Sequence, residues 1–289
     1  MLRLYKSPVQ SALAKELLQS AASVRFLRRR IAAVFFEPNE TSYDLRWRMF
    51  GTPVRVHPMF WLMSLILGYD ATIRHGVGFV LAWVGCVFVS ILLHEFGHVW
   101  MGRLFGSHGH IVLYSFGGLA IGSNQLSRRW QRVLVLLAGP GIQLLLWAVL
   151  EFGGLRLILS VPPESRRSAA LILSMLVEIN KFWPLLNLLP IWPLDGGQVA
   201  REVCQAIMSA RGTTVSLGIS MVVSGVLAAH ILMASQGRPL LPEKYVPRFS
   251  MFMALLFAML CVGSYAALQG ENERLQDERR HRWDHDEWT

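Results

Sequence analysis

The chain has 289 residues, of which 53% are hydrophobic and 16% are charged. A soluble domain usually carries charge on about a quarter of its residues, so this composition argues against a soluble enzyme and favours a membrane protein. The formal net charge of +9 comes from basic residues that flank apolar runs and do not form one patch. This distribution argues against nucleic-acid binding, and we expect no nucleic-acid partner.

The first 52 residues form a basic leader. Leu13, Leu17, Ala21 and Val24 recur at helical spacing, which is compatible with an amphipathic helix at a membrane surface or with a weakly ordered extension. The basic cluster at 28–30 is followed by a brief apolar stretch, too short for the core of a secretory signal. We therefore expect no cleaved targeting segment.

Six apolar runs follow, and crossing a bilayer core of about 30 Å takes roughly 20 such residues. The first run is short and the fourth contains polar residues. The sequence predicts an all-α polytopic membrane protein with about six transmembrane helices, at 55–70, 77–103, 132–152, 169–193, 214–234 and 249–268.

Most Lys and Arg residues lie before the first run, between the second and third, between the fourth and fifth, and after the sixth. The positive-inside rule then puts both termini in the cytoplasm, and we expect an integral protein of the cell (inner) membrane. The expected organisation is a basic cytoplasmic extension at 1–52, a transmembrane domain at 53–268 and a charged cytoplasmic tail at 269–289.

A short segment between the second and third runs favours strands. GHIVLYSFGGLAIGS contains two β-favouring stretches around Gly117 and Gly118, which is typical of a β-hairpin. We expect a small membrane-associated hairpin there.

The second run ends in HEFGH, which places His94, Glu95 and His98 in an otherwise apolar helix. Residues at i and i+4 share a helix face, so both imidazoles can bind one ion, with the carboxylate beside it. An ionisable group within a membrane span costs about 2.5–3.5 kcal/mol on insertion scales. Three polar groups in five residues therefore indicate a metal site, and H-E-x-x-H is the signature of zinc hydrolases.

A catalytic zinc usually has three protein ligands and an open position. The stretch NLLPIWPLDGG ends the fourth run with Asp195. Because the second and fourth runs cross in the same direction, Asp195 and His98 are expected at the same membrane face. Pro190 and Pro193 interrupt the helix, and irregular backbone at membrane depth belongs where it lines a cavity. Asp195 is therefore our candidate for the third ligand.

Other polar residues have more ordinary interpretations. His108 and His110 could gate the site or bind a transient metal, but solvated loop histidines are the commoner case. His57 is isolated near a run. Asn180 could assist an oxyanion or bridge two helices, and Lys181 could pair with an acidic residue one turn away.

With these motifs the chain resembles the site-2 protease family of intramembrane zinc metalloproteases, peptidase family M50. The resemblance rests on HEFGH at 94–98, FGGLA at 116–120, AGPG at 138–141 and NLLPIWPLDGG at 187–197, and it covers residues 50 to about 210. This would be a compact form, since the PDZ and CBS domains frequent in the family have no counterpart in the sequence.

The resemblance implies one Zn²⁺ per chain, bound by His94, His98 and Asp195. It also implies Glu95 as catalytic acid/base and Asn187 as the polar residue that helps to hold the substrate or the oxyanion. The implied activity is cleavage of a transmembrane or juxtamembrane peptide bond of a membrane protein. A membrane zinc transporter or metal sensor and an inactive scaffold stay open as alternatives, and oligomeric state is not indicated.

Overall fold

The computed structural model describes residues 38–72, 76–115, 117–238, 240 and 251–286. The amphipathic leader expected at Leu13 to Val24 lies outside these described residues.

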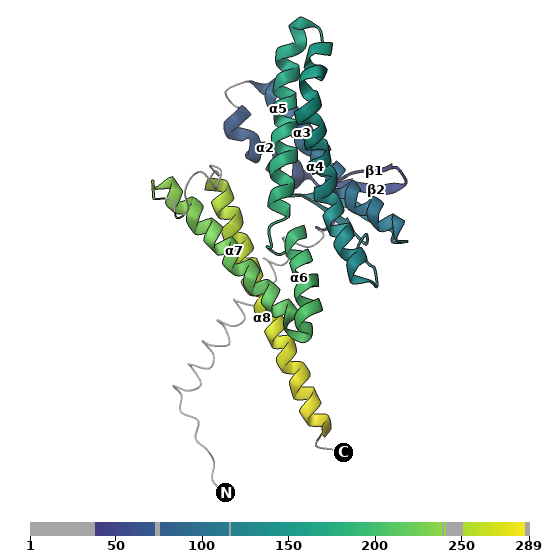
Figure 1. The fold of residues 1–289 in the computed structure, drawn as a ribbon, viewed down its shortest axis with the longest axis vertical. Coiled ribbons are helices and arrows are strands. Elements are labelled where there is room, and N and C mark those ends of the chain that lie inside the picture. Colours follow the sequence, from purple (N-terminus) through teal and green to yellow (C-terminus); the bar gives the residue numbers. More distant parts are fainter. Residues whose placement is uncertain (1–37, 73–75, 116, 239, 241–250, 287–289) are drawn as a thin grey trace. The chain divides into compact units, whose positions relative to one another are not determined.

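Among the described residues, five helices are long and apolar enough to cross a membrane, so the chain is a multi-pass membrane protein (Figure 1). They agree with the second to sixth runs of the sequence, so the predicted helical class is confirmed. Their bounds are α3 Val77–Leu104, α4 Arg129–Ser160, α5 Arg166–Asn187, α7 Gly212–Ser235 and α8 Met251–Asp286.

The first predicted span is shorter than the others. Helix α2, Pro58–Thr72, has 15 residues, so it is about 22 Å long at about 1.5 Å per residue. A bilayer core measures about 30 Å. The described residues therefore hold five long apolar helices and one short apolar helix, and the short one corresponds to the run that the sequence analysis identified as short.

The predicted hairpin is half of a larger sheet. Strands β1 Leu45–Met49, β2 Thr52–Val56, β3 His110–Tyr114 and β4 Gly117–Ile121 lie in the order β1-β2-β3-β4. The pairs β1–β2 and β3–β4 are antiparallel, while β2 and β3 are parallel. Strand β1 falls in the expected N-terminal extension and β2 in the expected transmembrane domain, so the sheet spans that predicted boundary.

The strand pairing locates the turn of each hairpin. Met49 pairs with Thr52 across Phe50 and Gly51, which both have positive φ, as the turns that match strand twist require. In the second hairpin Tyr114 pairs with Gly117. The second turn therefore precedes Gly117 and Gly118, which the sequence had suggested as its centre, and both glycines belong to β4.

The parallel β2–β3 pair fixes how the first helices run. Strand β2 leads into α2, and β3 follows α3, so this helix pair leaves the sheet and returns to it. The C-terminal end of α3, which carries the HEFGH motif, is therefore beside the sheet. Buried side chains of α2, α3, the sheet and α5 form one core, among them Val56, Phe60, Ile91, Phe96, Ile111 and Met175.

The helix of the fourth run ends six residues before the end predicted at residue 193. Helix α5 ends at Asn187, and α6, Asp195–Met208, begins with the aspartate itself. Pro190 and Pro193 lie between them and lack the N–H groups that a continuous helix needs. Two short 3₁₀ helices, η1 Pro163–Ser165 and η2 Ser209–Arg211, complete the described elements.

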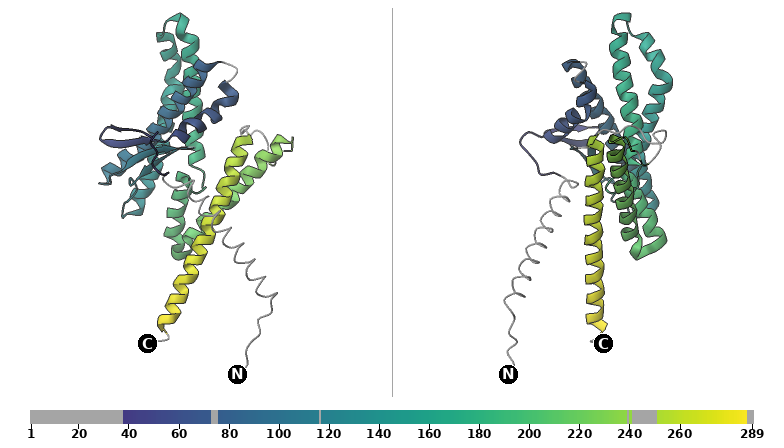
Figure 2. Two further views of the ribbon diagram at one scale, coloured as in Figure 1. Left: turned by 180° about the vertical axis from the view of Figure 1, so that it is seen from behind. Right: turned by 90° about the vertical axis from the view of Figure 1, so that its left-hand side faces the viewer.

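The site-bearing helices α3, α4 and α5 pack side by side, and α7 packs along α8 (Figure 2). Helix α6 contacts both α4 and α7. Arg132 of α4 ties α6 in place, since its Nε and Nη2 donate to the two carboxylate oxygens of Glu202, each at 2.7 Å. Two parallel charge-assisted bonds of this kind restrict rotation as well as distance, so the clamp orients the helix that begins with Asp195.

Candidate metal centre

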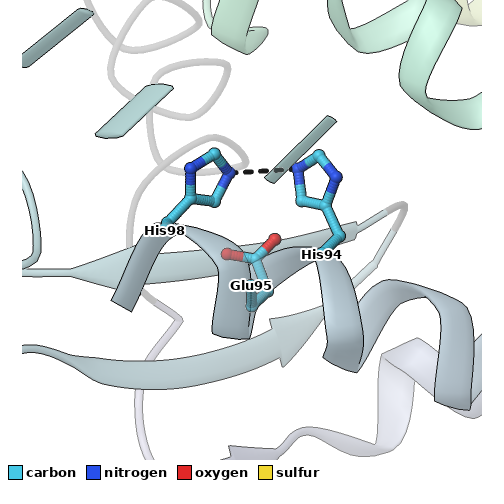
Figure 3. Close-up of side chains that lie close together, drawn as sticks. All are labelled: His94, Glu95 and His98. Atoms are coloured by element: carbon cyan, nitrogen blue, oxygen red, sulfur yellow. Dashed lines mark hydrogen bonds between the residues drawn. The ribbon is translucent and has the colours of Figure 1, made fainter. Parts of the chain in front are cut away.

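Three ionisable side chains project from the same part of α3. His94, Glu95 and His98 are 3%, 4% and 5% exposed, and their ligand atoms lie within 4.8 Å of one another. Figure 3 shows the two imidazoles facing each other with the Glu95 carboxylate beside them. His94 and His98 are four residues apart, and residues at i and i+4 lie on the same face of a helix. This is the arrangement that the sequence predicted.

The structure also brings Asp195 to this cluster. Its Oδ2 lies 3.1 Å from His94 Nε2 and 3.5 Å from His98 Nε2, and the two Nε2 atoms are 3.1 Å apart. Ligands bound at about 2.0–2.1 Å in a tetrahedral zinc site are separated by about 3.3 Å. Three of the four corners of such a site are therefore present at suitable spacing, from two helices separated by about a hundred residues.

A hydrogen bond to Nδ1 of each imidazole orients the ring so that its Nε2 atom faces the proposed metal position. His94 Nδ1 lies 2.8 Å from Gln143 Oε1, and His98 Nδ1 lies 2.7 Å from the Val135 carbonyl oxygen. A carbonyl oxygen accepts a hydrogen bond, so each Nδ1 carries a proton, and in the neutral form that binds a metal each ring presents its Nε2 lone pair to the centre. Two lone pairs and a carboxylate then converge in a buried place, an arrangement that a cation stabilises.

Two glycines allow α3 and α4 to approach closely here. A Cβ on Gly97 would lie 2.6 Å from the Ala138 carbonyl oxygen, and a Cβ on Gly139 would lie 2.3 Å from His98 Nε2 and 2.9 Å from His94 Nε2. Small residues at helix contacts are a common device in membranes. In this chain they leave room for the imidazoles against α4.

Strand β4 covers the other side of the motif. A Cβ on Gly118 would lie 2.3 Å from Glu95 Cγ, so the backbone of β4 is in direct contact with the proposed catalytic carboxylate. In the order of strands, β4 is at the end of the sheet.

The remaining predicted residues lie elsewhere. Asn187 is the last residue of α5 and is half-buried. Asn180 is fully buried and donates to Ser90 Oγ at 2.8 Å, which is the helix-bridging role left open by the sequence. The Lys181 ammonium lies 5.8 Å from the Trp147 ring centre, a cation–π contact. His57 Nδ1 accepts from the Met59 amide near the start of α2.

His108 and His110 are placed at the entry to the sheet. His108 is exposed in the loop after α3, and His110 is the first residue of β3. The metal cluster found among the described residues consists of other side chains, and a role for these two histidines in metal binding finds no support in it.

Sequence reasoning missed Gln143 and the Val135 carbonyl as partners of the histidines. Gln143 had a signal, since a glutamine in the apolar run GIQLLLW is costly unless it has a partner. The Val135 carbonyl could not be identified from the sequence, because every residue has a main-chain carbonyl group.

Comparison with known proteins gives a consistent result. Residues 158–229 match the family model for peptidase family M50. This range runs from the end of α4 into α7 and includes Asn187 and Asp195, while the HEFGH motif lies before it.

Several similar curated proteins are named as zinc metalloproteases. The chain is 31% identical over 166 residues to a putative zinc metalloprotease of Synechocystis, covering 54% of this chain and 42% of that protein. It is 23% identical over 201 residues to a zinc metalloprotease of Methanocaldococcus jannaschii, covering 66% and 57%. It is 26% identical to stage IV sporulation protein FB of Bacillus subtilis, covering 53% and 48%. The chain thus spans about half the length of these curated relatives.

Among solved structures, the fold is similar to that of the site-2 protease from Methanocaldococcus jannaschii. The TM-score is 0.51 at 21% identity, covering 77% of this chain and 94% of the other. At this identity the likeness concerns the fold.

Proposed function

We propose that the chain is a member of peptidase family M50, whose model matches residues 158–229. We propose further that it is an intramembrane zinc metalloendopeptidase that cleaves a transmembrane or juxtamembrane peptide bond of a membrane protein. The observation that carries the proposal is the convergence of the His94 and His98 imidazoles and the Asp195 carboxylate, with Glu95 beside them, in a buried site on a membrane-spanning helix. One Zn²⁺ per chain fits this donor set.

Bound zinc would act as a Lewis acid on the scissile carbonyl and lower the pKa of a bound water to about 7. The proposed general base is Glu95, because its carboxylate lies at the site and is not one of the three proposed metal ligands. Glu95 takes the proton from the attacking water and later delivers it to the leaving amine. The amide of Asn187 is our candidate donor to the oxyanion.

Strand β4 supports a mode of substrate binding. A peptide bond within a helix has its carbonyl hydrogen-bonded, so a transmembrane substrate must be extended before attack. An edge strand can hold an extended segment through main-chain hydrogen bonds. Because β4 ends the sheet and its Gly118 lies against Glu95, a segment added to β4 would run beside the catalytic carboxylate.

The orientation in the membrane is part of the proposal. The sheet, the end of α3 and α6 belong to one end of the molecule, and the chain returns to that end after each helix pair. The excess of Lys and Arg in the corresponding loops supports a cytoplasmic position for this end and for both termini. The membrane that we propose is the cell (inner) membrane.

The proposal is tested by cleavage of a membrane-protein substrate with purified protein in liposomes. Glu95→Gln removes the base and keeps the side-chain shape, and we expect it to retain stoichiometric zinc while cleavage falls by about 10²–10⁴-fold. Wild-type turnover in Glu95→Gln would refute the role of Glu95. Wild-type protein that binds no zinc would refute the whole assignment.

A zinc transporter or sensor would use the same ligands. It would need no carboxylate base at Glu95, and ionic groups would continue across the other half of the membrane. In the liposome assay it would move or retain zinc without cleaving protein, so the same preparation distinguishes the two functions.

A further inference from the structure

We infer that Gln143 of α4 is the positioning residue for the metal ligand His94, fixing its proton on Nδ1 and aiming its Nε2 at the metal. This inference rests on the proposed function and extends it to a residue that contacts neither metal nor substrate.

Gln143 is completely buried in the span formed by α4. Its Oε1 lies 2.8 Å from His94 Nδ1, and its Nε2 donates to the Ser90 carbonyl oxygen at 3.1 Å. Ser90 is one turn before His94 on α3, so the amide of Gln143 bridges two successive turns of the helix that carries the ligands. An uncompensated amide in an apolar helix is costly, and both ends of this one are satisfied at the metal-bearing helix.

The two contacts together determine the tautomer of His94. An amide could in principle be turned over, with its NH₂ group towards the histidine. The Ser90 carbonyl excludes that orientation because it can accept a hydrogen bond but cannot donate one. The NH₂ group therefore points to Ser90 and Oε1 points to His94, so the proton resides on Nδ1 and the lone pair on Nε2.

His98 is oriented differently. Its Nδ1 donates to the main-chain carbonyl of Val135, at 2.7 Å, which no substitution removes. Val135 and Gln143 are eight residues apart, about two helical turns, and so lie on one face of α4. Helix α4 thus orients both imidazoles, one through its backbone and one through the side chain of Gln143, and the second contact is open to mutation.

The test measures zinc affinity of the purified, full-length protein by competition with a chelator. Partners of metal-bound histidines are typically worth about 10–100-fold in metal affinity. Gln143→Leu has no acceptor, and the thioether of Gln143→Met is only a weak one, so we expect both variants to weaken zinc binding by about that factor. Gln143→Glu keeps an acceptor for Nδ1–H, and we expect wild-type or tighter affinity.

Asn180→Leu is the matched control. Asn180 is another fully buried amide bonded to Ser90, through Oγ at 2.8 Å, but it does not contact His94. We expect Asn180→Leu to leave zinc affinity within about threefold, so that general loss of a buried amide is separated from loss of the His94 contact.

Several results would overturn the inference. Wild-type affinity in Gln143→Leu and Gln143→Met, or an equal loss in Asn180→Leu, would do so. If the apolar variants fail to fold, a tenfold loss in Gln143→Glu would contradict it and retained affinity would support it. Cobalt-substituted protein gives a second readout, since Gln143→Met should change the visible spectrum of the bound ion. Because none of these measurements needs cleavage, a protein that binds zinc as described but cleaves nothing would refute the proposed function alone.

Discussion

At the scale of single residues, the site depends on a missing side chain as much as on those present. Gly139 of α4 lies directly against both imidazoles, and any Cβ there would be 2.3 Å from His98 Nε2. Real Cβ atoms do not approach that closely, and the histidines are held from behind by Gln143 and the Val135 carbonyl. The rings therefore have little freedom to retreat.

We predict that Gly139→Ala abolishes stoichiometric zinc binding, because the added methyl group displaces the two Nε2 atoms from their common centre. Metal content of the purified protein measures the effect. The matched control is Gly141→Ala, where a Cβ meets nothing within 4 Å. It should bind zinc normally and be unchanged or more stable by up to about 1 kcal/mol, as for alanine in place of helical glycine. Equal zinc content in the two variants would contradict the prediction.

The sequence predicted individual site residues where a polar side chain in a membrane span is energetically costly. His94, Glu95 and His98 are polar groups in an apolar helix, and their spacing alone indicates a shared face. Gln143 gave a weaker signal of the same kind. Gly139 gave none beyond its size, because a glycine in a membrane helix is common and its contact with the histidines depends on how α3 meets α4.

At the scale of elements, β4 is the strand that lies against the proposed catalytic carboxylate of Glu95. Its two glycines differ in what surrounds them. Gly118 lies against Glu95, whereas a Cβ on Gly117 would meet only the edge of Trp183, at an ordinary 3.9 Å. The pair therefore separates an effect on the carboxylate from a general effect on the strand.

We predict that Gly118→Ala lowers the cleavage rate by about 10²-fold, the cost typical of moving a catalytic group by about 1 Å, while zinc content stays normal. The reason is the overlap of the new methyl group with Glu95 Cγ and its carboxylate. Gly117→Ala should cleave at close to the wild-type rate. Similar rates in both variants would show that β4 does not constrain Glu95.

The sheet was only partly predictable, for a physical reason. The β3–β4 hairpin is local, so β-favouring residues on either side of a turn revealed it. The β2–β3 pair joins Val54 to Ile111, with two helices between them, and such a long-range pairing leaves no local pattern. Asp195 illustrates the same limit: the prolines before it indicated a break, but not that a new helix begins at the aspartate.

At the scale of the whole molecule, the placement of loops follows from the connections between elements. Residues around η1 join the ends of α4 and α5 that lie away from the metal site, while residues around η2 join α6 to α7 on the side of the site. If the site faces the cytoplasm, these two loops are on opposite sides of the membrane.

We predict opposite labelling of Ser165→Cys and Ser209→Cys by a membrane-impermeant maleimide. Ser165→Cys should react in intact cells, and Ser209→Cys should react in inverted membrane vesicles, because a charged reagent cannot cross the bilayer. The background is the protein with Cys86, Cys204 and Cys261 replaced, which also serves as the unlabelled control. Labelling of both positions from the same side would refute the proposed orientation.

The separate origin of Asp195 has a consequence for biosynthesis. The two imidazoles are set in place once α3 meets α4, but the carboxylate follows about a hundred residues later, at the start of α6. A ribosome emits the chain from its N-terminus, so an ion cannot be enclosed by all three groups until α5 has been inserted and α6 has emerged. Acquisition of the metal is therefore expected late in assembly, and under the proposed function a nascent chain shorter than this would be inactive.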